Sequence, residues 1–110
     1  MMLARKGENV MLENEAEFLA FLSDTKGASE NTILSYKRDI KNFFQYLSET
    51  GIKDLQSITS LTLSAYTLYL QNSKKASSTI SRNIASLKCY FSFLHSRNKI
   101  QFNPASDLES

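Results

Sequence analysis

Two stretches of the sequence combine basic side chains with short hydroxyl or amide side chains. The first stretch contains Asn31, Thr32, Ser35, Lys37, Arg38 and Lys41, and the second contains Lys75, Ser77, Ser78, Thr79, Arg82, Ser86 and Lys88. Lysine, arginine and hydroxyl side chains, with the amide groups of a helix N-terminus, are the groups that bind phosphate oxygens. Helix capping explains about one or two hydroxyl groups per helix, whereas the start of the last helix has four, on Ser77, Ser78, Thr79 and Ser81. The two stretches therefore predict nucleic-acid binding, against the simpler interpretation of capped helices with solvated faces.

Residues that serve enzymes and metal sites are scarce in this chain. His95 is the one histidine and Cys89 the one cysteine, so neither a zinc cluster nor a Cys–His nucleophile pair is identifiable. The three glycines are too far apart to form a loop that cradles phosphates. We therefore expect no catalytic residues, no metal ion and no cofactor in this segment.

The distribution of charge favours an anionic partner more than the net charge of +2 does. Residues 1–54 contain nine acidic and seven basic residues, whereas residues 55–106 contain six basic residues and no acidic one. A basic segment of this kind favours a nucleic acid, although six basic residues in half of a chain also arise by chance.

Length and apolar content are typical of a soluble globular protein of one domain. Its 110 residues suffice for one domain, and 42% of them are hydrophobic. No run approaches the ~18 apolar residues of a membrane span. A single cysteine allows no internal disulfide and fits a reducing compartment. We expect a soluble, cytoplasmic protein that makes no membrane contact.

Hydrophobic periodicity and helix-end residues predict four helices, and no stretch alternates with the period of a strand. The expected ranges are about Asn14–Thr25, Ser29–Glu49, Ser60–Gln71 and Ser77–Asn98. The predicted fold class is all-α, a compact four-helix orthogonal bundle. The expected organisation is a flexible tail at residues 1–10, a domain at residues 11–103 and the start of a linker at residues 104–110.

Residues suited to helix ends support these ranges. Ser29 and Thr59 are suited to cap the second and third helices, and Asn14 with Glu17 matches a capping box at the start of the first. Gly27 and Gly51 are suited to the left-handed position that follows a helix.

Two of the expected helices have unusual faces. The last helix has an apolar stripe (Ile80, Ile84, Leu87, Phe91 and Leu94) and an opposite face of small residues around one arginine (Ser78, Arg82, Ala85, Ser86 and Cys89). A face of such low relief lets the backbone approach an anionic partner closely. The third helix has no charged residue and is apolar nearly all round, so we expect it to lie deepest or to contact a partner.

Two motifs resemble those of a known family. The first, Ser29-Glu30-Asn31-Thr32-x-x-x-Tyr36-x-x-Asp39-Ile40-x-x-Phe43, is similar to the opening of the N-terminal, core-binding (SAM-like) domain of tyrosine recombinases and phage-type integrases. The second contains Thr79-Ile80-x-Arg82-x-Ile84 and Leu87-Lys88, and closes with Asn103-Pro104-Ala105. It resembles the last helix of the same domain and the segment by which the chain leaves that domain. The order and spacing of the motifs together point most closely to Xer-type recombinases.

The resemblance implies a four-helix DNA-binding domain that forms half of a clamp around duplex DNA. It implies that the second and fourth helices lie against the major groove, with Thr32, Arg38, Arg82 and Lys88 as the leading contacts and Ser78 and Thr79 near them. Lys88 stands where the family commonly has arginine, which would weaken a bidentate contact.

The same resemblance implies that the catalytic Arg, Lys, His-x-x-Arg and Tyr residues belong to a further domain. The segment would then be a fragment of a recombinase that cleaves and rejoins DNA as a tetramer, and alone it would be a monomer. A second interpretation stays open, in which the segment is a protein–protein interaction module that docks through its uncharged third helix.

Overall fold

Helices make up most of the described chain. The computed structural model describes residues 6–52 and 54–108, with side chains from Asn14 onward. Its elements are α1 (Lys6–Asp24), α2 (Glu30–Thr50), the 3-10 helix η1 (Leu55–Ser57), α3 (Ser60–Asn72) and α4 (Ser77–Ser96). The described residues contain no strand, and the predicted all-α class is confirmed.

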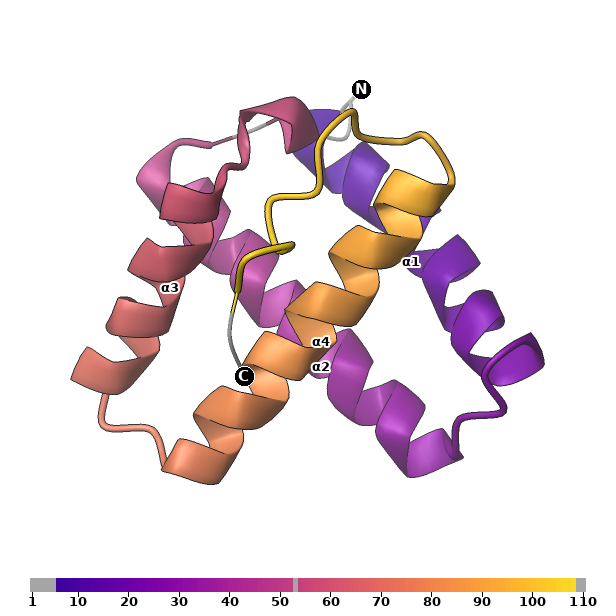
Figure 1. The fold of residues 1–110 in the computed structure, drawn as a ribbon, viewed down its shortest axis with the longest axis horizontal. Helices are drawn as coiled ribbons and strands as arrows, with labels where there is room; N and C mark the ends of the chain where they lie inside the picture. Colours follow the sequence, from indigo (N-terminus) through magenta and orange to yellow (C-terminus); the bar gives the residue numbers. More distant parts are fainter. Residues whose placement is uncertain (1–5, 53, 109–110) are drawn as a thin grey trace, which may run out of the picture. The chain divides into compact units, whose positions relative to one another are not determined.

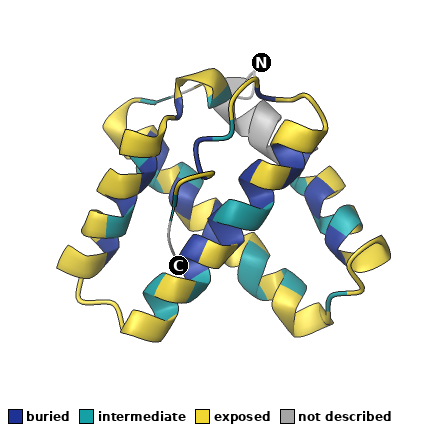
Figure 2. Cartoon of the chain, viewed as in Figure 1, coloured by how far each residue is buried: buried dark blue, intermediate teal, exposed yellow. Residues whose placement is uncertain are grey.

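The chain divides into two compact units, Met1–Leu55 and Gln56–Ser110. In the first unit α1 packs against α2, and in the second α3 packs against α4. Figure 1 shows each pair as a helical hairpin, the first in indigo to magenta and the second in red to yellow. Figure 2 shows buried and exposed positions alternating along the helices, as expected for helices with one buried side.

The turn of the first hairpin is closed by backbone hydrogen bonds around Gly27. The amide of Ala28 donates to the carbonyl of Leu22 over 2.9 Å, and Gly27 has a φ of 63°. A left-handed residue just after the last turn of a helix is the geometry that glycine adopts without strain. Gly27 and Gly51, whose φ is 88°, both end helices as the sequence predicts.

The core of the first unit comes from one side of each helix. Phe18 and Leu22 of α1 and Ile40, Phe43 and Leu47 of α2 are buried. The rings of Phe18 and Tyr36 stack with centroids 6.4 Å apart. Each such side chain contributes about 1.5–3 kcal/mol when it is removed from water, so these contacts hold the hairpin together.

The core of the second unit is larger and includes residues beyond α4. Its buried side chains are Ile58, Leu63, Tyr66, Leu70, Ile84, Leu87, Tyr90, Phe91, Phe93, Leu94, Ile100 and Ala105. After α4 the chain turns back at Asn98, whose φ is 59°, and in Figure 1 the yellow segment then runs opposite to α4. Gln56 Nε2 donates to the carbonyl of Lys99 over 2.9 Å, which ties this segment to η1.

The start of the first helix differs from the expectation. The helix begins at Lys6, not at Asn14, and Asn14 is an interior position that is only 4% exposed. Asn14 lies one turn before Phe18 and two turns before Leu22, on the buried side, so the apparent capping box with Glu17 does not mark a helix end. Residues 1–5 of the expected tail lie outside the described residues, and residues 6–10 belong to α1.

The end of the packed chain also differs from the expectation. Pro104 and Ala105, placed at the start of a linker, are buried. The side-chain carbonyl of Asn103 accepts a hydrogen bond from the amide of Ala105 over 2.9 Å, and the amide of Leu108 donates to the carbonyl of Ala105 over 3.1 Å. This asparagine turn continues the ordered structure past Pro104.

Candidate nucleic-acid interface

The candidate residues of α2 lie on its exposed side. Asn31, Thr32, Lys37, Arg38 and Lys41 are exposed, and Ser35 is half-buried. The opposite side of α2 carries the buried residues Asp39, Ile40, Phe43 and Leu47. Three cations on one exposed helix face, next to short polar side chains, form a surface that can contact phosphate groups.

Thr32 has a structural role as well. Ser29 caps α2, because its Oγ accepts a hydrogen bond from the amide of Thr32 over 3.2 Å and donates to Thr32 Oγ1 over 2.9 Å. The Ser-x-x-Thr part of the first motif is therefore a helix cap. The hydroxyl of Thr32 retains its own proton, so capping does not prevent it from donating to a ligand.

The candidate residues at the start of α4 are exposed too. Lys75, Ser77 and Ser78 are exposed, and Thr79 and Arg82 are half-buried. The N-cap of α4 is Ala76, and the cap makes no side-chain hydrogen bond. Exposed cations, hydroxyl groups and the positive end of the helix dipole thus occur together at this helix start.

Ser86 does not belong to the exposed face on which the sequence placed it. Its side chain is 0% exposed, and its Oγ donates to the carbonyl of Arg82 over 3.0 Å. Ser86 lies four residues before Tyr90 and seven before Phe93, which are buried as well. These two aromatic residues widen the buried side of α4 beyond the predicted apolar stripe and bring Ser86 into it.

The exposed face of α4 is therefore rotated about the helix axis relative to the face that the sequence predicts. It is formed by Ser78, Ser81, Ala85 and Ser92, with the half-buried Arg82, Lys88 and Cys89 at its sides. Ser92 is the position of this face that the sequence reasoning missed, whereas Ser81 is among the hydroxyl groups that it places at the helix start. A wider apolar arc that included Tyr90 and Phe93 would have identified Ser92. The face keeps the low relief predicted for it.

Two buried polar residues were also missed by the sequence reasoning. Asn83 is 4% exposed, and its side-chain amide donates to the carbonyl of Thr79 over 2.8 Å. Asp39, which the first motif contains, is 1% exposed. Its spacing of three from Tyr36 and four from Phe43 places it in the apolar row of α2, which is the available signal.

The third helix is not the deepest element of the structure. Leu63, Tyr66 and Leu70 of α3 are buried, but Leu61 is 79% exposed, Leu68 55% and Tyr69 45%. The exposed apolar residues recur with Ala65 at helical spacing and form a stripe along α3. The half of the expectation that placed this helix deepest is wrong.

The described residues contain neither a candidate membrane span nor a candidate metal site. None of the helices there has the length and apolar content needed to cross a membrane. That part of the chain also contains no group of three or more His, Cys, Asp or Glu side chains that could hold a metal ion.

The fold and the candidate faces define a small all-α domain with basic, hydroxyl-bearing surfaces on α2 and at the start of α4. The chain belongs to the phage integrase N-terminal SAM-like domain family, whose pattern matches residues 16–98. This match confirms the resemblance that the two sequence motifs predict.

Curated relatives are named as tyrosine recombinases. The chain is 36% identical over 98 residues to tyrosine recombinase XerD of Rickettsia prowazekii, which covers 89% of this chain and 31% of the relative. It is 31% identical over 100 residues to tyrosine recombinase XerC of Herpetosiphon aurantiacus, which covers 91% of this chain and 33% of the relative. The chain thus spans about a third of the length of these relatives. No solved structure shows a significant match to it.

Proposed function

We propose that this chain is the core-binding domain of a site-specific tyrosine recombinase or integrase and that it binds duplex DNA at the recombination site. One observation carries the proposal: in a member of this family, the exposed side of α2 and the first turns of α4 both bear cations and short polar side chains. Phosphate contacts of this kind position a protein on a duplex without reading its sequence.

The residues proposed to contact DNA are those of the two exposed faces. They are Asn31, Thr32, Ser35, Lys37, Arg38 and Lys41 on α2, and Lys75, Ser77, Ser78, Thr79, Arg82 and Lys88 at and after the start of α4. Ser86 is not proposed again, because its hydroxyl is buried and bonded to the backbone. In the proposed complex α2 and α4 both lie against the major groove, and the domain forms half of a clamp.

The whole protein is proposed to be an enzyme that integrates or recombines DNA in the bacterial cytoplasm. Its relatives are about three times as long as the matched segment. We place the catalytic arginine, lysine, histidine and tyrosine residues in the part of the whole protein that corresponds to the unmatched two thirds of its relatives. Other recombinase subunits would then be partners on DNA, while the segment alone would be monomeric.

A titration of the 110-residue chain with a short mixed-sequence duplex tests DNA binding. Amide chemical shifts should change in Asn31–Lys41 and Lys75–Lys88, and the affinity should fall steeply between about 50 and 200 mM salt, because bound cations release counterions from the duplex. Shift changes confined to α1 and α3 would contradict the proposal.

A second candidate function is contact with a partner protein through α3. The exposed stripe of Leu61, Ala65, Leu68 and Tyr69 favours it, because an apolar helix face of this length is a common contact surface. Sedimentation at increasing protein concentration distinguishes the two functions. Self-association without any DNA affinity would favour the docking function over the proposed one.

A further inference from the structure

One exposed residue of α2 differs in chemistry from the polar face on which it lies. Leu34 is 54% exposed, and it lies on the side of α2 opposite to the buried residues Ile40, Phe43 and Leu47. A single exposed leucine is common on protein surfaces. The position of this one is unusual, because among the described residues it is the one large apolar side chain that is exposed on either proposed contact face.

Leu34 lies at the centre of the exposed face of α2. Lys37 and Arg38 follow it by three and four residues and so lie on either side of it, while Lys41, seven residues on, continues its row. Asn31 lies one turn before it, and all four of these polar residues are exposed. A helix that enters the major groove brings its central row nearest to the base edges and its lateral rows nearest to the phosphates. Leu34 is therefore in the row suited to the bases.

The chemistry of a leucine side chain restricts what it can contact in that groove. It has no donor and no acceptor, so contact with a phosphate would remove water from the anion without replacing a hydrogen bond. The one apolar group that base pairs present in the major groove is the C5 methyl group of thymine. Leu34 is thus matched to thymine, and the side-chain amide of Asn31, one turn away, is of the type that pairs with adenine.

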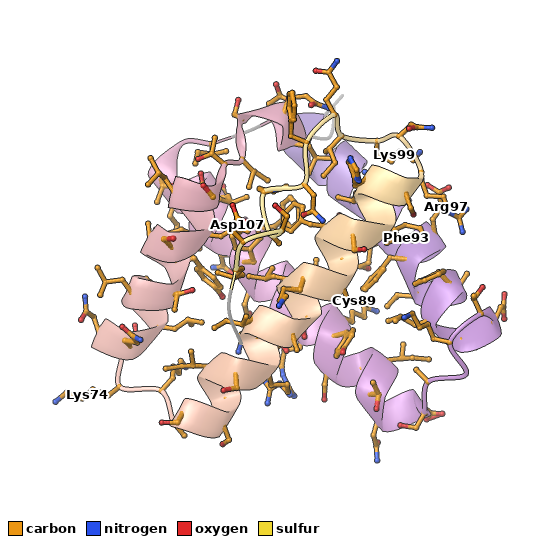
Figure 3. The ribbon with its side chains drawn as sticks, in the orientation of Figure 1. Lys74, Cys89, Phe93, Arg97, Lys99 and Asp107 are labelled. Atoms are coloured by element: carbon orange, nitrogen blue, oxygen red, sulfur yellow. The ribbon has the colours of Figure 1, made fainter. Side chains whose placement is uncertain are left out.

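The exposed face of α4 has no comparable side chain. It is formed by Ser78, Ser81, Ala85 and Ser92, and its side chains are short, as is that of Cys89 beside the ribbon of α4 in Figure 3. Short hydroxyl-bearing side chains suit phosphate contacts. Of the two proposed contact faces, that of α2 is therefore the one that carries an apolar group for direct contact with a base.

We infer that Leu34 is a specificity-determining residue of this domain, which contacts the C5 methyl group of a thymine in the major groove and so makes the domain prefer an A·T base pair at that position. This inference rests on the proposed DNA binding. It adds sequence recognition to a surface that is otherwise argued from phosphate contacts, which carry no sequence information.

Replacement of thymine by uracil tests the inference, because uracil lacks only the C5 methyl group and pairs with adenine as thymine does. The 110-residue chain is first used to select a preferred duplex from a pool of short random duplexes. Each thymine of that duplex is then replaced singly by uracil. At one position the original chain should bind the uracil form about 3–5-fold more weakly, the loss expected when one methyl group is removed from an apolar contact.

Leu34→Ala should remove this discrimination. The variant should bind the thymine duplex about 3–5-fold more weakly than the original chain and should no longer distinguish the two forms at that position. Its salt slope should stay unchanged, because no phosphate contact is lost. Leu68→Ala, at a 55% exposed leucine of α3, is the matched control and should bind both forms as the original chain does. Both variants should stay folded, which circular dichroism checks, since alanine is the best helix former.

The failure of this inference and the failure of the proposed function give different results. If the original chain binds DNA with the expected salt dependence but selects no sequence, or distinguishes no thymine from uracil, the role of Leu34 is overturned and the proposed function stands. The same conclusion holds if Leu34→Ala retains the discrimination or weakens the binding of both forms equally. If the original chain binds no duplex at all, the proposed function fails and this inference fails with it.

Discussion

At the scale of single residues, burial decides which polar side chains of α4 can meet a ligand. Ser78 and Ser86 both follow the helical spacing of Arg82, but Ser78 is exposed and Ser86 is completely buried. A hydroxyl that is buried and bonded to the backbone stabilises the helix interior and is not available to DNA.

A pair of identical substitutions tests this difference in burial. Ser86→Leu should lower the free energy of unfolding by about 1–3 kcal/mol, because the larger side chain overpacks a filled site. Ser92→Leu, on the exposed face of the same helix, should stay within about 0.5 kcal/mol of the original chain. Urea unfolding of both variants measures the difference. Equal effects would show that Ser86 is not in the core.

At the scale of helices, the ends of the elements follow local rules at most positions. Ser29 caps α2, and Thr59 caps α3 through a reciprocal pair of hydrogen bonds with Thr62. Gly51 ends α2. The start of α4 is the exception, because Ala76 occupies the N-cap without a side-chain hydrogen bond. Lys74, whose φ is 61°, and Ala76 flank Lys75 in the same turn.

The missing cap of α4 leads to a stability prediction. Ala76→Ser should raise the free energy of unfolding by about 1 kcal/mol, because a serine at the N-cap accepts a hydrogen bond from an amide of the first turn. The same substitution at Ala85, an exposed interior position of α4, should lower it by a few tenths of a kcal/mol, since serine is a weaker helix former than alanine. Urea midpoints measure both changes. Destabilisation by both would mean that Ala76 is not an N-cap in solution.

At the scale of the whole molecule, charge is divided between the two units. Residues 1–55 contain nine acidic and seven basic residues, a net charge of −2, whereas residues 56–110 contain two acidic and six basic residues, a net charge of +4. The second unit should therefore dominate the general attraction to DNA. In the proposed complex the first unit would contribute through the exposed cations of α2, which are concentrated on one helix face although the net charge of the unit is negative.

If both units bind DNA, substitutions in the two units should lower the salt slope of duplex binding additively. Arg38→Ala and Arg82→Ala should each lower the salt slope of duplex binding by about 0.9, and the double variant by about 1.8, because each removes one phosphate contact. Lys26→Ala, in the turn between α1 and α2, is the control and should weaken binding less than Arg82→Ala. Fluorescence anisotropy at several salt concentrations measures the slopes. Equal effects of the Lys26 and Arg82 substitutions would remove Arg82 from the site, and a double variant no weaker than one single variant would confine binding to one unit.

The sequence by itself determined the features that depend on neighbouring residues. Ser29, Thr59, Gly27 and Gly51 were identified as helix-end residues because capping and left-handed turns are local effects. The apolar spacing of α2 and α4 was sufficient for the all-α class. The spacing of the motifs from Ser29 to Phe43 and after Thr79 was sufficient for the family.

Only the tertiary structure decided how much of each helix is covered. Periodicity gives the angular position of Ser86, Tyr90 and Phe93 on α4, but the width of the buried arc depends on what packs against the helix. The same reason explains Asn14, whose apparent cap lies inside a longer helix, and Ala105, which is buried beyond the last helix. The exposed stripe of α3 is likewise set by the packing of the second unit, because an apolar residue type alone does not show whether it is covered.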